Sequence, residues 1–243
     1  MVRWRIILAI AALLGGSVTL PVRAEHIAVI GTGEVGSVLG KKWAAKGHKI
    51  VYGSRTPDAD KVKQVVKDTG HGASVTTPEK AAAAADMVLL AVPSPTAKDV
   101  VPKLGNLAGK IVMDPMNYYL PVDGYPGPLQ GPSLAQQVQT WLPGAKVVKA
   151  FNTFAMKMIE DPKLAGGPIT VPIAGDDVEA KARVGKLATD AGLEFLDVGP
   201  LTAATFIEGM EQLYLGYRMY HRGKGKGFEF HLRPVPDTVF PVR

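Results

Sequence analysis

The fold is decided by residues 26–36, which read HIAVIGTGEVG. An apolar run typical of a strand leads here into a GxGxxG loop and then into a helical pattern that continues to Lys46. In such a loop Gly31 allows a tight turn, Gly33 lets a ligand approach the main chain, and Gly36 lets the helix pack closely on the strand. The combination predicts a cradle for the pyrophosphate of a dinucleotide, which the free amide groups of a helix N-terminus favour.

The next expected strand, residues 49–53, indicates which dinucleotide fits. Sites for NAD place a carboxylate at the end of this strand, about 20 residues beyond the glycines, to bind the adenosine 2′-hydroxyl. This chain has Ser54 and Arg55 there instead, and a guanidinium matches the oxygen atoms of a phosphate. The sequence therefore predicts NADP, with its 2′-phosphate on these two residues. Thr56 and Pro57 also resemble the N-cap and the first residue of the following helix.

The composition excludes several classes of site. The 243 residues contain no cysteine, which excludes disulfides, thiolate metal sites and cysteine nucleophiles. The net charge of +6 falls to +3 if residues 1–24, with their three arginines, are removed, so a nucleic-acid surface is not indicated. With 47% apolar residues, the chain can bury the core of one domain or slightly more.

The N-terminal residues have the layout of a signal peptide. Arg3 and Arg5 precede the apolar run 6–14, and Ala24 offers a small residue for cleavage. We expect residues 1–24 to be removed and the mature protein to be periplasmic or secreted, without a stable membrane span. The alternatives are a membrane anchor, for which the run is shorter than the ~20 residues of a bilayer span, and a cytoplasmic protein.

From Glu25 onward, short β-branched runs alternate with helical stretches. This alternation predicts an α/β fold of the Rossmann type, a doubly wound and mostly parallel sheet, with a short helical extension at the C-terminus. We assign residues 25–199 to the NADP-binding domain and residues 200–243 to a helix and tail that pack on the same domain. The expected strands are 26–30, 49–53, 73–76, 87–92, 110–114, 146–150, 169–174 and 194–198. The expected helices after the first one include 77–85, 176–191 and 200–221.

The last expected helix carries a set of apolar side chains at helical spacing. We interpret them as core residues packed against the sheet, and we regard a homodimer through this helix as a further hypothesis. The set consists of Phe206, Met210, Leu213, Tyr214 and Tyr217.

The sequence shows no acid–base or nucleophile motif and no spaced set of metal ligands, so no catalytic residue is assigned. His48, His71, His221 and His231 are most simply packing or surface residues. Such a sequence still suits a nicotinamide enzyme, because hydride transfer to another redox cofactor requires position more than a base.

Six short motifs follow one another along the chain. They are Gly31-Thr32-Gly33-Glu34-Val35-Gly36, Gly53-Ser54-Arg55, Ala91-Val92-Pro93, Lys149-Ala150-Phe151-Asn152-Thr153, Ala174-Gly175-Asp176-Asp177 and Asp197-Val198-Gly199-Pro200-Leu201. In this order they resemble the NADPH-dependent deazaflavin oxidoreductases, the NADP oxidoreductases of coenzyme F420. The resemblance extends from His26 to Arg233.

The resemblance implies a site for NADP(H). The residues that it assigns to the cofactor are Gly31, Thr32, Gly33, Glu34, Val35 and Gly36 at the pyrophosphate, Ser54 and Arg55 at the 2′-phosphate, Ala91, Val92 and Pro93 at the nicotinamide, and Asn152 at the edge of the same crevice. Lys149 borders that crevice as well, and Asp114 and Asn117 are weaker candidates. The alternative interpretation is that Lys149 is solvated and that Asn152 caps the helix after it.

The resemblance further implies an NADPH-dependent oxidoreductase that transfers a hydride between NADP(H) and a small-molecule acceptor, a flavin or a deazaflavin. A reductase of imines or carbonyls, of the pyrroline-carboxylate or β-hydroxyacid type, is a second hypothesis. Such enzymes usually add a helical dimerisation domain that is longer than the stretch after Pro200. A third hypothesis is a non-catalytic NADP-binding module of the cell envelope.

Overall fold

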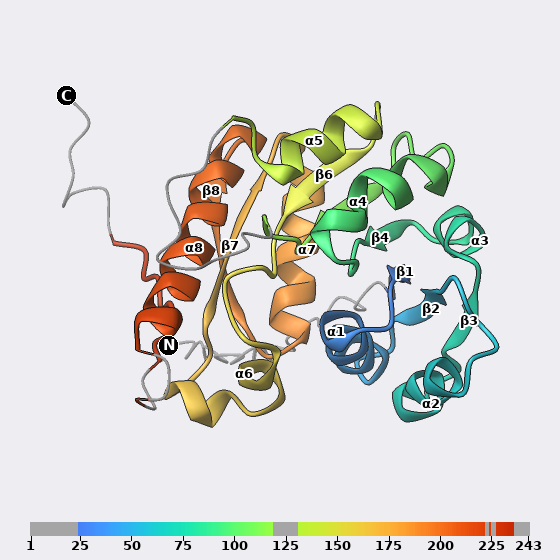
Figure 1. The fold of residues 1–243 in the computed structure, drawn as a ribbon, viewed down its shortest axis with the longest axis horizontal. Coiled ribbons are helices and arrows are strands. Elements are labelled where there is room, and N and C mark those ends of the chain that lie inside the picture. Colours follow the sequence, from blue (N-terminus) through green and yellow to red (C-terminus); the bar gives the residue numbers. More distant parts are fainter. Residues whose placement is uncertain (1–23, 119–130, 222–223, 225–226, 236–243) are drawn as a thin grey trace, which may run out of the picture.

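An eight-stranded sheet forms the centre of the protein. The computed structural model describes residues 24–118, 131–221, 224 and 227–235. The strands are β1 (His26–Ile30), β2 (Lys49–Gly53), β3 (Ser74–Thr76), β4 (Met87–Leu89), β5 (Ile111–Asp114), β6 (Lys146–Lys149), β7 (Thr170–Gly175) and β8 (Glu194–Gly199). They lie in the order β3-β2-β1-β4-β5-β6-β7-β8, with helices on both faces (Figure 1).

Helices connect successive strands. The α-helices are α1 (Glu34–Ala44), α2 (Asp60–Thr69), α3 (Pro78–Ala84), α4 (Ser94–Val100), α5 (Leu134–Trp141), α6 (Met156–Glu160), α7 (Val178–Asp190) and α8 (Ala204–Tyr220), and the 3-10 helices are η1 (Val101–Leu104), η2 (Pro162–Ala165) and η3 (Leu201–Ala203). The predicted α/β fold of the Rossmann type, with a C-terminal helix, is therefore confirmed.

The expected signal peptide lies outside the described residues, except for Ala24. The tail beyond Val235 lies outside them as well. In the part of the chain that the structure describes, no helix combines the length and the apolar character needed to cross a bilayer.

The eight expected strands are all present, with ends that differ by a few residues. The largest difference is the fourth strand, expected over 87–92, which ends at Leu89. The N–H of Leu90 still donates to the carbonyl oxygen of Met113 at 3.0 Å, and the chain then passes the glycine loop: the carbonyl oxygen of Ala91 lies 2.1 Å from the position that a Cβ on Gly31 would take. This close approach stops the strand early.

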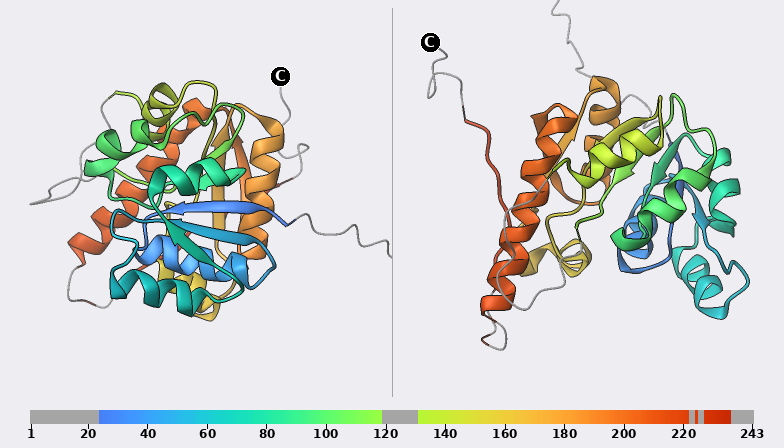
Figure 2. Two further views of the ribbon diagram at one scale, coloured as in Figure 1. Left: turned by 90° about the vertical axis from the view of Figure 1, so that its right-hand side faces the viewer. Right: turned by 45° about the horizontal axis from the view of Figure 1, so that its top comes forward.

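The last two strands run against the others. Strands β1 to β6 all run parallel to one another, whereas β7 is antiparallel to β6 and parallel to β8. β7 pairs with β6 only at Gly175 and Ala174, so residues 170–173 extend past the carboxyl end of β6. Helix α8 packs against β7, and Figure 2 shows this part of the molecule on the side opposite to β1, β2 and β3.

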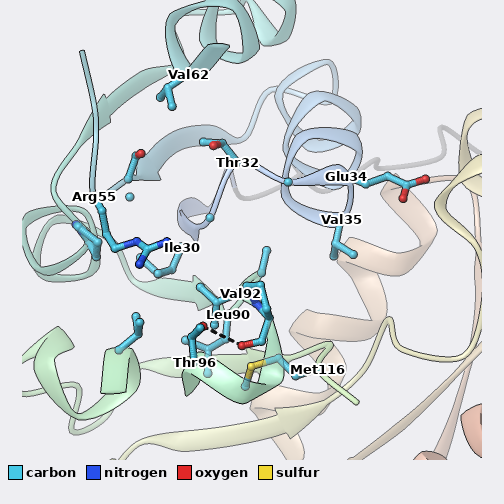
Figure 3. Close-up of a pocket in the computed structure, with 18 of the residues that line it drawn as sticks. Ile30, Thr32, Glu34, Val35, Arg55, Val62, Leu90, Val92, Thr96 and Met116 are labelled. Carbon is cyan, nitrogen blue, oxygen red and sulfur yellow. Dashed lines mark hydrogen bonds between the residues drawn. The ribbon is translucent and has the colours of Figure 1, made fainter. Parts of the chain in front are cut away.

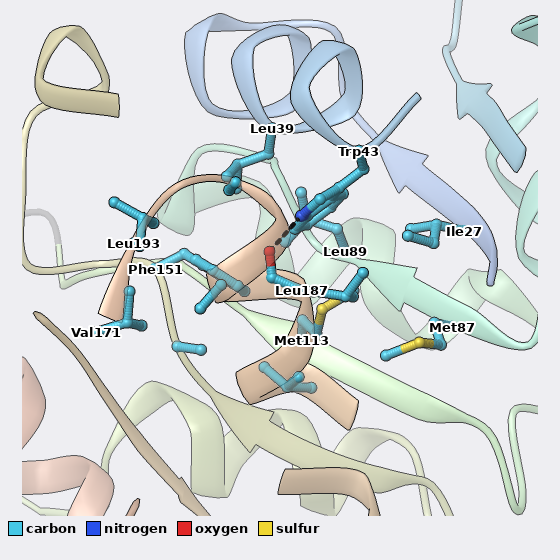
Figure 4. Close-up of a cluster of buried hydrophobic side chains, with 14 of the residues drawn as sticks. Ile27, Leu39, Trp43, Met87, Leu89, Met113, Phe151, Val171, Leu187 and Leu193 are labelled. Carbon is cyan, nitrogen blue, oxygen red and sulfur yellow. Dashed lines mark hydrogen bonds between the residues drawn. The ribbon is translucent and has the colours of Figure 1, made fainter. Parts of the chain in front are cut away.

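The core on the α1 and α7 face of the sheet is centred on Trp43 of α1. Its ring is fully buried, packs edge-on against Phe151 at 5.6 Å between centroids, and donates its indole N–H to the carbonyl oxygen of Leu187 of α7 at 2.8 Å (Figure 4). A second cluster fills the opposite face under α3, α4 and α5. Trp43 therefore ties the first βαβ unit to the second half of the chain.

The interpretation of the α8 apolar residues as core is wrong in part. Tyr214 is buried, whereas Phe206 is 78% exposed and Leu213 is 50% exposed. Ile207, one position along, takes the buried place instead. Successive helical residues differ by about 100° around the axis, and the spacing pattern alone did not distinguish which of two neighbouring apolar stripes meets the sheet.

The acidic pair Asp176 and Asp177 has a structural role. Asp177 is the N-cap of α7, where its carboxylate accepts the main-chain N–H of Ala180 at 2.8 Å. The Asp176 carboxylate accepts the N–H of Leu201 at 2.8 Å, at the start of η3. This motif therefore joins β7, α7 and the entry to α8.

Candidate functional site

A groove of about 850 Å³ lies at the carboxyl ends of β1, β2, β4 and β5 (Figure 3). In open α/β sheets this edge is the usual place for ligands. Of the residues assigned to the cofactor from the sequence, all except Gly36 and Asn152 line the groove. The lining residues are Ile30, Gly31, Thr32, Gly33, Glu34, Val35, Gly53, Ser54, Arg55, Thr56, Lys61, Val62, Pro78, Leu90, Ala91, Val92, Pro93, Thr96, Val100, Pro115 and Met116.

The three glycines of the loop differ in what surrounds them. Gly31 has a φ of +111° and touches the Ala91 carbonyl, and a Cβ on Gly36 would lie 2.3 Å from the carbonyl oxygen of Gly31. A Cβ on Gly33 would meet nothing within 4 Å. The fold itself therefore requires two of the glycines, while the third leaves open space in the groove where a ligand can approach the main chain.

Helix α1 starts at this open space. Gly33 is its N-cap and supplies no side-chain acceptor, so the first amide groups of the helix have no side-chain cap. Glu34 and Val35, in the first turn, line the groove, and Figure 3 shows the Glu34 carboxylate directed away from its centre. Free amides and the positive end of the helix dipole make this a favourable position for a phosphate.

One end of the groove is positively charged. Figure 3 shows the Arg55 guanidinium pointing into it, and Arg55 makes no hydrogen bond or ion pair with any residue that the structure describes. Lys61 of α2 also lines the groove, likewise without such a partner among the described residues. The Arg55 guanidinium next in sequence to the Ser54 hydroxyl, with Lys61 in the same groove, provides charge and donors of the kind that a 2′-phosphate requires.

Thr56 does not cap the next helix, contrary to the interpretation of its sequence context. Helix α2 begins only at Asp60, with Ala59 as N-cap. The N–H of Thr56 donates instead to the Ser54 hydroxyl at 3.2 Å. The Ser54 oxygen is therefore fixed next to Arg55 by the turn that follows it.

The opposite end of the groove is apolar. Leu90, Ala91 and Val92 follow β4, and Pro115 and Met116 follow β5. Helix α4 begins directly after Pro93, whose carbonyl accepts the Thr96 hydroxyl at 2.8 Å (Figure 3). An apolar surface with few polar groups suits a flat heteroaromatic ring and keeps water from it.

A buried ionic cluster lies behind this apolar end. The Lys149 ammonium lies 3.1 Å from Asp114 Oδ2 and 2.9 Å from Glu208 Oε1, and it also donates to the carbonyl oxygen of Met116. The three charged side chains are at most 1% exposed, so the interpretation of Lys149 as solvated is wrong. Burial raises the pKa of Glu208, and the Lys149 charge opposes that rise.

Asn152 lies next to this cluster rather than in the groove. Its Nδ2 donates to Asn117 Oδ1 at 2.8 Å, and Asn117 Nδ2 donates to the main-chain oxygen of Asn152 at 2.9 Å. The alternative that Asn152 caps the following helix is wrong, because the N-cap of α6 is Ala155. Its assignment to the cofactor stays a prediction.

Lys61 and Met116 are among the groove residues that were not assigned from the sequence. Lys61 is the second residue of α2, which begins at Asp60, later than its sequence context indicated. Met116 belongs to a loop whose path depends on residues far away in the chain. Among the described residues, no group of three or more histidine, aspartate or glutamate side chains is arranged to hold a metal ion.

Comparison with known proteins connects this geometry to a family. The family model described as NADP oxidoreductase coenzyme F420-dependent matches residues 26–118. The F420-dependent NADP reductase of Methanocaldococcus jannaschii is 31% identical over 225 residues, which cover 83% of this chain and 96% of that protein. The metalloreductase STEAP3 of Rattus norvegicus is 28% identical over 202 residues, which cover 81% of this chain and 38% of the longer relative.

Solved structures agree with these sequence matches. A protein of Arthrobacter sp. FB24, described as a candidate F420-dependent NADP reductase, superposes with a TM-score of 0.76 at 30% identity, covering 87% of this chain and 100% of that one. The imine reductase of Aspergillus terreus, solved with NADPH4, gives a TM-score of 0.60 at 17% identity, covering 81% of this chain and 63% of that one. At this lower identity the likeness concerns the fold alone.

Proposed function

Since the chain belongs to the family of coenzyme F420-dependent NADP oxidoreductases, we propose that it transfers a hydride between NADP(H) and a flavin or deazaflavin acceptor. NADP-dependent oxidation and reduction follow from the family. The acceptor and the role of each residue are our proposal.

The groove carries this proposal, because its two ends match the two ends of the cofactor. Arg55 lies at one end, the apolar residues after β4 and β5 form the other, and Lys61 also lines the groove; neither cation has a partner among the described residues. Between them, the open space at Gly33 and the uncapped start of α1 lie where a pyrophosphate would be held. Such an order of charge, amide groups and apolar surface fits a phosphorylated dinucleotide in one orientation.

Each part of the chain then has a defined task. Bound NADPH supplies the hydride from its nicotinamide ring. Arg55 and Lys61 hold the 2′-phosphate, the first turn of α1 holds the pyrophosphate, and Val92 and Met116 exclude water beside the ring. Because no proton-transfer side chain is required between two stacked redox rings, the rate depends on proximity and orientation.

The proposal is tested by following NADPH oxidation at 340 nm with the purified protein and a panel of acceptors. The panel contains riboflavin, FMN, FAD, a 5-deazaflavin, ferric chelates, a cyclic imine and a β-keto acid. We expect turnover with a flavin or deazaflavin and none with the imine or keto acid. Turnover with the imine or keto acid alone would establish the second hypothesis instead.

Binding of NADPH without oxidation by any acceptor would contradict the proposal in another way. It would favour a non-catalytic NADP-binding module. Calorimetry with NADPH separates this outcome from an inactive preparation, because a folded module still binds the nucleotide. A protein that binds no nicotinamide nucleotide would contradict all three hypotheses.

We further propose that the protein is exported, since Arg3, Arg5 and the apolar run 6–14 have the layout of a signal peptide. Intact mass measurement on protein recovered from the envelope fraction tests this. The expected mass is that of a chain beginning at Glu25. A full-length chain in the cytoplasmic fraction would contradict export.

We also propose a homodimer through α8. Phe206, Leu213 and Tyr220 are exposed and follow one another at intervals of seven residues, so they lie along one face of the helix. Leu213 is the midpoint of this stripe, so a second copy placed antiparallel about a twofold axis would pair Phe206 with Tyr220 in both directions. Light scattering should give twice the chain mass, and Leu213→Asp should give a monomer. A monomeric wild type would contradict the proposal.

A further inference from the structure

We propose that Lys149 is a positioning residue for the nicotinamide end of the groove and that it acts through the main chain of Met116. The inference rests on the proposed function, because it takes NADP(H) to lie in the groove with its 2′-phosphate at Arg55. Lys149 does not line the groove and has no task in the hydride transfer itself.

Met116 is fixed at both of its main-chain polar groups. Its N–H donates to Asp114 Oδ1 at 2.8 Å, and its carbonyl oxygen accepts the ammonium of Lys149. The same ammonium lies 3.1 Å from Asp114 Oδ2, so one ion pair holds the residue from two sides. Met116 in turn lines the apolar end of the groove.

The burial of these charges favours a positional role over a purely stabilising one. Lys149 and Asp114 are fully buried, and buried ion pairs contribute little net stability compared with apolar side chains of similar size. Apolar residues could fill the ends of β5 and β6 equally well. Charged hydrogen bonds add direction, because they hold the main chain at Met116 within a narrow range of positions.

Glu208 extends this support to the second half of the molecule. Its Oε1 lies 2.9 Å from the Lys149 ammonium, and its Oε2 accepts the N–H of Leu134, the first residue of α5, at 3.0 Å. The loop at Met116, the start of α5 and helix α8 are therefore connected through one ammonium group. The position of the apolar end of the groove thus depends on how α8 packs against the rest of the protein.

The experiment compares two ligands by calorimetry: NADP⁺ and 2′-phospho-ADP-ribose, which lacks the nicotinamide. For Lys149→Met we expect the Kd of NADP⁺ to rise about tenfold and that of the fragment to change less than about twofold, since only the nicotinamide end is disturbed. The matched control is Lys146→Met on the same strand, whose ammonium pairs with Asp177 at 2.8 Å. It should change neither Kd.

The inference would be overturned if folded Lys149→Met bound both ligands more weakly by the same factor, or bound both as the wild type does. Lys149→Met leaves two buried carboxylates without a cation and can fail to fold. In that event Asp114→Asn decides, because it leaves Lys149 and Glu208 as a balanced pair. We expect it to raise the ratio of the two dissociation constants about threefold, and an unchanged ratio would overturn the inference. Wild-type protein that binds neither ligand would instead refute the proposed function.

Discussion

The two ends of the groove are built from different kinds of contact. At the positively charged end, Gly33 and Arg55 both belong to the first βαβ unit of the chain. At the apolar end, Met116 depends on Lys149, and Leu134 on Glu208, which lie 33 and 74 residues away in the chain. The positively charged end can therefore be recognised from a local motif, whereas the apolar end exists only in the folded molecule.

The largest expected effect concerns the contact between the first βαβ unit and the second half of the chain. Trp43→Ala removes a buried ring and its hydrogen bond to Leu187, and it should lower the free energy of unfolding by about 3–5 kcal/mol. Urea unfolding measures this loss. Trp141→Ala is the matched control, since Trp141 is only partly buried, and it should cost less than half as much. Equal losses would mean that Trp43 does not join the halves.

The glycine loop gives the next effect. Gly33→Val fills the open space in the groove, so we expect the Kd for NADPH to rise by about 100-fold while Tm falls by less than about 3 °C. Gly31→Val should destabilise the protein itself, because its Cβ would meet the carbonyl oxygen of Ala91. Thermal unfolding and calorimetry on both variants check the difference. Normal NADPH binding by Gly33→Val would contradict the placement of the pyrophosphate.

Selection of the cofactor comes third. Arg55→Ala should weaken NADPH by about 1.5–3 kcal/mol and leave NADH almost unchanged, because only the 2′-phosphate loses a charged hydrogen bond. Lys61→Ala should act in the same direction with a smaller effect, since Lys61 is a flexible point charge. Lys63→Ala, on the exposed side of α2, is the control. Equal losses for NADPH and NADH would contradict the assignment to the 2′-phosphate.

The smallest expected effect is a pH dependence of the stability, and it comes from a group in the second half of the chain. Burial raises the pKa of Glu211 on α8 from 4.5 to about 8, and the Glu229 carboxylate adds to the rise while Arg218 and Lys149 oppose it. The folded state therefore holds a proton that the unfolded state releases, so the stability from this group is complete below about pH 4.5 and is lost as the pH rises to about 8.

Glu211→Gln should remove this dependence. We expect its Tm to exceed that of the wild type by a few degrees at pH 8.5 and to match it near pH 5, with NADPH binding unchanged at both. Glu79→Gln, an exposed residue of α3, should leave the pH profile as it is. A profile that Glu211→Gln does not flatten would place the titration elsewhere.

Prediction from the sequence succeeded where neighbours in the chain are also neighbours in space. The strands, the turn at Gly31 and the place of Arg55 along the groove follow from local patterns, since each depends on period, on turn residues or on one missing carboxylate. The roles of these residues at the cofactor stay predictions. The same reasoning failed for Lys149. A lysine at a strand end reads as solvated, and nothing near it in sequence indicates that Asp114 and Glu208 will surround it.

The sequence by itself determined the doubly wound sheet, the glycine turn that leads into α1 and the family, because hydrophobic period and glycine spacing act through contacts within one βαβ unit. Only the tertiary structure decided which face of α8 is buried, that Asn152 lies outside the groove, and that a buried ammonium holds Met116. Those outcomes depend on the desolvation of groups from distant segments, and that free energy is defined only once the segments have come together.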